Sequence, residues 1–167
     1  MPSPSPAPKA AVLIGVAGSG KTAVGARLAR QLHFLFLDAD DFHPAANVEK
    51  MKHGIPLTDE DRDPWLHRLH DELQRQLAAG RSVILACSAL KAAYRKILNE
   101  GMPQLVFVYL AVDRETIRQR LGSRSHFFPK ELMDSQFAAL EKPCDAIWVD
   151  ARRPVDQVVQ QAAQALQ

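Results

Sequence analysis

Cysteine is scarce in this sequence, and the spacing of the cysteines predicts no site. Only Cys87 and Cys144 occur among 167 residues, and they do not form a CxxC pair. Neither a structural zinc site nor a disulfide framework is therefore predicted. We expect both cysteines to be small apolar side chains in the protein interior.

Long apolar runs and a strong excess of one charge are also missing. The apolar stretch 11–17 is too short to span a bilayer, and it leads into Gly-Ser-Gly-Lys rather than a signal-peptide cleavage site. The formal net charge is only +2, and no basic face with interleaved aromatic residues is evident. We therefore expect a cytoplasmic protein that binds neither membranes nor nucleic acid.

The residues that are present are typical of one globular domain. Hydrophobic residues make up 47% of the chain and charged residues 24%. A chain of this length can remove about 70% of its unfolded surface from water. The first nine residues differ from the rest because four of them are prolines, which resist both helix and sheet. We predict a disordered tail over 1–9 and a single domain over 10–167.

After this tail, short apolar runs alternate with longer segments of helical period. Pro64 suits the first turn of a helix and Gly80 suits a helix end. The alternation predicts an α/β fold of three layers, in which helices flank a five-stranded parallel sheet. The predicted strands are 11–14, 34–37, 82–87, 105–110 and 146–149, and the predicted helices are 22–32, 64–79, 89–99, 114–121, 129–140 and 154–166.

The strongest motif lies between the first predicted strand and the first predicted helix. Residues 15–22 read Gly-Val-Ala-Gly-Ser-Gly-Lys-Thr and match G-x-x-x-x-G-K-[ST]. Backbone N–H groups of such a loop, together with a helix N-terminus, surround phosphate oxygens. Lys21 would reach the β- and γ-phosphates, and the Thr22 hydroxyl would ligate the bridging Mg²⁺. The predicted residues for ATP or GTP binding are Gly15, Val16, Ala17, Gly18, Ser19, Gly20, Lys21 and Thr22.

Three acidic residues, Asp38, Asp40 and Asp41, follow the second predicted strand. The carboxyl ends of strands in an open α/β sheet face the ligand crevice, and side chains two residues apart point to the same side. One of Asp38 and Asp40 would then bind the Mg²⁺ ion and the other would accept a proton from an acceptor hydroxyl. The alternative is that all three acids solvate the strand end. Asp41 should face away from the other two and suits a helix N-terminus.

Two other classes of nucleotide-binding protein are possible from the loop alone. A switch GTPase would share the loop, but the sequence has neither an Asp-x-x-Gly for the γ-phosphate nor an Asn-Lys-x-Asp for guanine. An RNA-binding or scaffold module would need the basic face that is missing. The residues therefore favour a small-molecule kinase.

Further segments are more specific than the phosphate loop. They are 37–44 (LDADDFHP), 47–51 (NVEKM), 54–62 (GIPLTDEDR), 64–66 (PWL), 87–91 (CSALK), 94–95 (YR), 120–128 (RLGSRSHFF), 135–137 (SQF) and 140–143 (LEKP). In these segments, which cover nearly the whole chain after the tail, the sequence resembles gluconate kinases. These are small P-loop kinases related to shikimate kinase and to the nucleoside monophosphate kinases.

The resemblance implies a reaction and a set of roles. The reaction is transfer of the γ-phosphate of ATP to the 6-hydroxyl of D-gluconate, which feeds gluconate into the pentose phosphate pathway. Asp38 would ligate Mg²⁺, and Asp40 would be the base. Arg120 would stack on adenine, and Arg124 would stabilise the transferring phosphoryl group within a small mobile lid over about 121–130. Relatives suggest a homodimer. The residues implied for gluconate binding are Asp40, His43, Lys91, Arg95 and His126.

Each of these assignments has a simpler alternative. Lys91 and Arg95 could be a solvated pair on one helix face, and His43 and His126 could be ordinary surface histidines. The lid arginines could line a solvated basic helix face. Arg62 could either serve the site or anchor the loop 59–61 through ion pairs, whereas we expect Trp65 to pack in the core. Shikimate kinase is the nearest enzymatic rival, although it would require a glycine cluster where this chain has 87–91.

Overall fold

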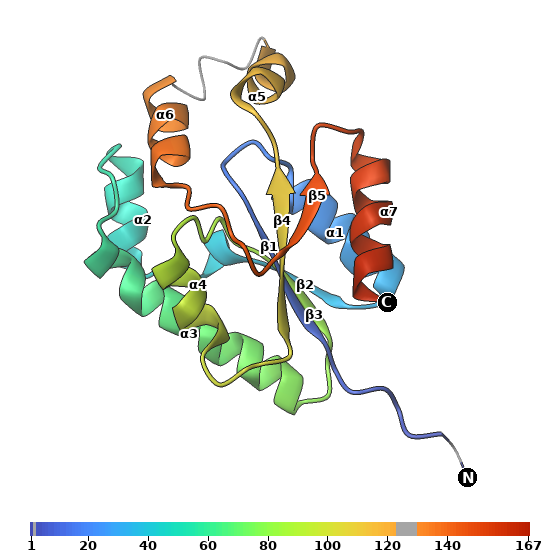
Figure 1. Ribbon diagram of the computed structural model, residues 1–167. Helices are drawn as coiled ribbons and strands as arrows, with labels where there is room; N and C mark the ends of the chain where they lie inside the picture. The colour runs from blue at the N-terminus through green and yellow to red at the C-terminus, as the bar shows by residue number, and fades with distance from the viewer. Residues whose placement is uncertain (2, 123–129) are drawn as a thin grey trace.

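The computed structural model describes residues 1, 3–122 and 130–167 (Figure 1). Within these residues, five parallel strands form one sheet in the order β2-β3-β1-β4-β5. The α/β fold class is confirmed, and each predicted strand is present with ends that differ by one residue or less. The strands are β1 Ala10–Ile14, β2 Leu35–Asp38, β3 Val83–Ala86, β4 Leu105–Ala111 and β5 Ile147–Asp150.

Helices cover both faces of this sheet and complete three layers (Figure 1). On one face, α3 and α4 bury leucines such as Leu69 and Leu98 against Val12 of β1. On the other face, α1 and α7 pack around Leu13 and Ile84. The helices are α1 Lys21–Leu32, α2 Ala45–Lys52, α3 Asp59–Ala78, α4 Ala92–Asn99, α5 Arg114–Leu121, α6 Lys130–Ala139 and α7 Val155–Leu166, and a 3-10 turn, η1, lies at Ala39–Phe42.

The predicted start of α3 at Pro64 is wrong, because the helix begins five residues earlier at Asp59. Thr58 and Asp61 form a capping box, in which each side chain bonds the other residue's backbone N–H. Proline inside a helix costs roughly 3 kcal/mol. The cap offsets about 1 kcal/mol of this cost, and the Lys50–Asp61 and Lys91–Asp59 ion pairs hold the added first turn in place.

The predicted start of the helix after β3 is also wrong, because α4 begins at Ala92 rather than at 89. Ala89 has a φ of 40°, in the left-handed region, which interrupts helical geometry. The Arg95 guanidinium donates to the carbonyl oxygens of Ala89 and Leu90 at 2.8 and 3.1 Å, so these carbonyls face that side chain. The strand end is therefore followed by a short non-helical loop that borders the site.

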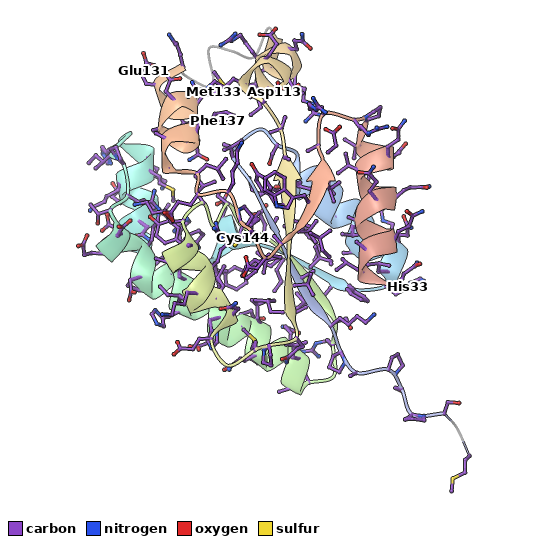
Figure 2. All side chains as sticks on the ribbon, viewed as in Figure 1. His33, Asp113, Glu131, Met133, Phe137 and Cys144 are labelled. Carbon is purple, nitrogen blue, oxygen red and sulfur yellow. The ribbon has the colours of Figure 1, made fainter. Side chains whose placement is uncertain are left out.

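The two cysteines have different surroundings. Cys87 is buried at the end of β3, as expected, whereas Cys144 is exposed, so the prediction that it lies in the interior is wrong (Figure 2). Cys144 follows Pro143 in the irregular connection between α6 and β5, where few side chains cover it.

Among the described residues, no helix has both the length and the apolarity needed to cross a membrane.

Candidate active site

The phosphate loop lies between β1 and α1, as the motif predicts. Gly15, Gly18 and Gly20 have backbone φ values of 152°, 84° and 96°, which residues other than glycine rarely adopt. A Cβ atom on Gly15 would also lie 2.9 Å from the Ser19 hydroxyl. Gly20 precedes α1 without any side-chain cap, so the first N–H groups of this helix are left for another acceptor. This arrangement is suited to an anion.

Lys21 is the first residue of α1, and its ammonium group folds back over the loop. The Lys21 Nζ atom donates to the carbonyl oxygens of Gly15 and Val16 at 2.9 and 3.0 Å. Burial lowers the pKa of Lys21 to about 8, although the negative charges of Asp40 and Asp38 partly oppose this shift. The site therefore contains a partly desolvated cation that a polyphosphate would stabilise.

Thr22 and Asp38 meet across the phosphate loop and the end of β2. The Thr22 Oγ1 atom donates to Asp38 Oδ2 at 3.1 Å, and Asp38 Oδ1 accepts the backbone N–H of Asp40 at 3.0 Å. Asp38 thereby caps η1 and fixes the turn that presents Asp40. The capping role expected of Asp41 belongs to Asp38, because η1 starts directly at the strand end.

A cavity of about 430 Å³ joins these groups. Its wall combines the phosphate loop with Asp38 and Asp40 from the end of β2 and with Cys87 and Ser88 from the end of β3. A cavity of about 820 Å³ beside Trp148 and Tyr109 is larger, but no described residue that the sequence predicts for the site lines it. The chemistry therefore points to the smaller cavity.

Asp40 of η1 lines this cavity, and His43 directly follows η1. Burial and the nearby charge of Asp38 raise the pKa of Asp40, while His43 and Lys21 oppose the increase. Burial likewise lowers the pKa of His43, with Asp40 acting in the opposite direction. A carboxyl group with a raised pKa beside a neutral imidazole is suited to accepting a proton at near-neutral pH.

Trp65 and Asn47 fix the orientation of His43. The Trp65 ring stacks on the imidazole with centroids 4.2 Å apart, and its indole N–H donates to the Ala39 carbonyl at 2.8 Å. Trp65 is buried, which confirms its predicted core position. The Asn47 Nδ2 atom lies 3.3 Å from His43 Nδ1 and donates to the Asp61 carbonyl at 2.9 Å. The neutral ring therefore carries its hydrogen on Nε2. Sequence reasoning missed Asn47, since α2 has too weak an apolar pattern to be predicted.

The structure separates Lys91 and Arg95, which the sequence placed on one helix face. Lys91 precedes α4, and its ammonium group pairs with Asp59 at 3.2 Å. Arg95 is only 7% exposed and donates to the carbonyl oxygens of Ala89, Leu90 and Glu141. Its guanidinium therefore organises the loop after β3, and direct contact of Arg95 with a substrate stays a prediction.

Arg62 anchors its surroundings through hydrogen bonds and not through the ion pairs with residues 59–61 that were one alternative for it. Within the described residues, Asp59 pairs with Lys91 and Asp61 with Lys50, whereas Arg62 bonds other groups. It donates to the Leu57 carbonyl at 2.7 Å and to the Tyr94 hydroxyl at 3.5 Å. The Tyr94 hydroxyl in turn donates to Asp59, whose carboxylate also pairs with Lys91. These contacts link the starts of α3 and α4. They lie beside Lys91, in the part of the site where we expect the phosphate acceptor and which we call the acceptor side.

Of the predicted site residues Arg120, Arg124 and His126, the structure describes only Arg120. Its guanidinium, at the end of α5, donates to the carbonyl oxygens of Ala151 and Arg153 in the connection from β5 to α7. Arg124 and His126 lie outside the described residues, as does most of the predicted lid over 121–130.

The groups at the loop fit a nucleotide with its metal better than a resident metal ion. Across residues 1, 3–122 and 130–167, no three His, Cys, Asp or Glu side chains gather around one point. Mg²⁺ commonly uses one or two protein oxygens and takes its other ligands from water and phosphates. The Thr22 hydroxyl and the Asp38 carboxylate are such a pair.

Comparisons with known proteins show which proteins this chain resembles. The profile of a family described as "AAA domain" matches residues 11–147. The chain is 44% identical to the thermosensitive gluconokinase of Escherichia coli, over 93% of this chain and 86% of that protein. It superposes on a gluconokinase from Sinorhizobium meliloti with a TM-score of 0.85 and 38% identity, covering 96% of this chain and 92% of that one. A shikimate kinase from Aquifex aeolicus shares the fold, with a TM-score of 0.57, 21% identity and coverage of 94% and 95%.

Proposed function

The chain belongs to the gluconokinase family of P-loop kinases, and we propose that it transfers the γ-phosphate of ATP to the 6-hydroxyl of D-gluconate. The products are 6-phospho-D-gluconate and ADP. One observation supports this reaction above the others. The Thr22 hydroxyl, the Asp38 carboxylate and the Asp40 turn are joined by hydrogen bonds at one edge of the phosphate-loop cavity.

In this proposal the loop and the acids divide the work. The loop amides and Lys21 bind the phosphates, and Lys21 neutralises charge as the phosphoryl group moves. Thr22 and Asp38 would hold Mg²⁺, which would offset negative charge on the phosphates. Asp40 accepts the proton of the attacking hydroxyl. We retain Arg120 for adenine, Arg124 for the transferring group, and His43, Lys91, Arg95 and His126 for gluconate.

Lys91 makes the acceptor side of the proposal more specific. Its ammonium group is paired with a carboxylate, Asp59, in the protein alone. The carboxylate of gluconate is the same chemical group, so it can take the place of Asp59 beside Lys91, while Asp59 keeps the hydrogen bond from the Tyr94 hydroxyl. Shikimate also carries a carboxylate, so the choice of gluconate over shikimate rests on the family.

We propose further that the enzyme is a cytoplasmic homodimer that acts at the entry of gluconate into the pentose phosphate pathway. The resemblance to gluconate kinases is the basis for the dimer and for the pathway. Light scattering on the purified protein would measure its molar mass, and a monomer would contradict this part of the proposal.

Substrate preference is the most direct test of the reaction. With MgATP, we expect gluconate to exceed shikimate, other sugar acids and nucleoside monophosphates by at least about 100-fold in kcat/KM, because a site built to pair acceptor hydroxyls rejects ligands that leave its polar groups unpaired. A coupled assay for ADP measures all of these acceptors. Preference for shikimate would overturn the assignment, and GTP hydrolysis without any acceptor would instead support a switch protein.

The pH dependence of nucleotide binding is a second expected result. Lys21 has a pKa of about 8 in the protein alone, and phosphate charge favours its ammonium form. Binding should therefore take up a proton above pH 8. The affinity for MgADP should be constant from pH 7 to 8 and then fall up to about tenfold per pH unit. Calorimetry in two buffers of different ionisation enthalpy measures the uptake, and equal affinities at pH 7.5 and 9.5 would contradict it.

A further inference from the structure

Helix α6 contacts the phosphate loop through one polar side chain. The Oε1 atom of Gln136 accepts the backbone N–H of Ala17 at 3.0 Å, although the two residues are 119 positions apart. Ala17 lines the cavity assigned to the nucleotide, whereas Gln136 belongs to the helix that follows residues 123–129 in the chain. A residue outside the loop motif therefore fixes the direction of one loop amide.

An apolar contact beside this hydrogen bond keeps the loop and the helix together. Val16, next to Ala17, is buried with Ile117 of α5, Met133 of α6 and Leu90 from the loop after β3. Figure 2 shows Met133 and Phe137 on the side of α6 that faces α5 and the sheet. The position of Gln136 is thus set by packing on the same helix rather than by its own hydrogen bond.

The other end of α6 is tied to the acceptor side of the site. The backbone N–H of Glu141 donates to the Leu90 carbonyl at 2.8 Å, and its side chain accepts the Ala92 N–H at 2.7 Å. On the opposite side, Asp134 pairs with Arg114 of α5, and the Arg114 guanidinium lies 4.9 Å from the centre of the Phe137 ring. Helix α6 therefore connects the phosphate loop, the loop after β3 and α5.

We propose that Gln136 is a positioning residue for phosphoryl transfer, which orients the phosphate loop at Ala17 relative to the acceptor side of the site. A carboxamide is suited to this place because it offers an acceptor oxygen without a negative charge next to bound phosphates. Phosphoryl transfer depends mainly on alignment, and a displacement of about 1 Å can cost about 100-fold in rate. The inference rests on the proposed kinase activity, which the acceptor assay on the unaltered enzyme tests separately.

Three substitutions separate positioning from a structural role. Gln136→Met keeps the size of the side chain and removes the acceptor, Gln136→Asn keeps the amide but is one methylene too short, and Gln136→Glu keeps the acceptor and adds a charge. We expect the first two to lower kcat by about 10- to 100-fold with smaller changes in KM. We expect Gln136→Glu mainly to raise the KM for ATP through repulsion. Gln160→Met, on the exposed surface of α7, is the matched control.

Hydrogen exchange of the Ala17 amide, followed by NMR on the nucleotide-free protein, gives a readout that does not depend on activity. Exchange should accelerate at least tenfold in Gln136→Met and Gln136→Asn, and should stay slow in Gln136→Glu and in the control. Unchanged exchange in all variants, or wild-type kcat in both Gln136→Met and Gln136→Asn, would overturn the proposal. If Gln136→Met fails to fold, comparison of Gln136→Asn with Gln136→Glu in Ala17 exchange and kcat still tests the positioning role.

Discussion

Replacing Lys21 by methionine should lower kcat/KM for phosphoryl transfer by about 1,000-fold or more. The Lys21 ammonium group is the basic side chain within the phosphate loop, and burial lowers its pKa to about 8. A preorganised positive charge in a site of this kind stabilises the transferring group far more than it would in water. Because the charged form is already disfavoured by burial, the substitution should not cost the fold a favourable charge.

The same chain contains a matched control for this experiment. Lys9 also donates to two backbone carbonyls, those of Leu166 and Gln167, but it lies beside the C-terminus rather than at the cavity. Lys9→Met therefore removes the same kind of contact and should leave kcat/KM unchanged. Steady-state assays and thermal melts on both variants measure the two effects. Substantial turnover by a folded Lys21→Met protein would contradict the assigned role.

The sequence predicts the place and backbone geometry of the phosphate loop well because the loop is local. Residues 15–22 are consecutive, and their geometry follows from glycine backbone freedom and from the start of α1. Asp38 and Asp40 could be placed from one rule, that strand ends of a parallel sheet meet at the ligand crevice. The cavity that joins them to the loop is consistent with that reasoning.

The acceptor half was harder to predict because its contacts join distant segments. Lys91 and Arg95 are four residues apart, but the helix begins only at Ala92, so the two side chains have different surroundings. Their partners, Asp59 and Glu141, come from other elements, and no local pattern identifies them. Gln136 is a similar case, since segment 135–137 matches the family but nothing in the sequence shows that this amide reaches Ala17.

The two carboxylates at the end of β2, those of Asp38 and Asp40, differ in their hydrogen bonds. Both carboxylate oxygens of Asp38 are hydrogen-bonded: one accepts from the Thr22 hydroxyl and the other from the backbone N–H of Asp40. Within the described part of the chain, the carboxylate of Asp40 accepts no comparable hydrogen bond. This difference supports the proposal that Asp38 binds the metal and that Asp40 serves the acceptor hydroxyl.

Asp40→Asn should lower kcat by about 100- to 10,000-fold while nucleotide affinity changes little. Asparagine has nearly the same shape, but it cannot accept a proton from the attacking hydroxyl. The pKa of Asp40 is raised by burial and by Asp38, so the unaltered enzyme should lose activity below that pKa as the carboxylate becomes protonated. The variant should lack this acidic limb of the pH profile of kcat.

Asp41→Asn is the control for Asp40→Asn, because it removes the same charge from the neighbouring residue of η1. Asp41 does not line the phosphate cavity, whereas Asp40 does, so the control should keep kcat within about twofold of the unaltered enzyme. Calorimetry with MgADP verifies that both variants still bind nucleotide. Wild-type kcat in Asp40→Asn would remove Asp40 as the base, whereas equal losses in both variants would indicate that the net charge at the strand end, rather than proton transfer, controls the rate.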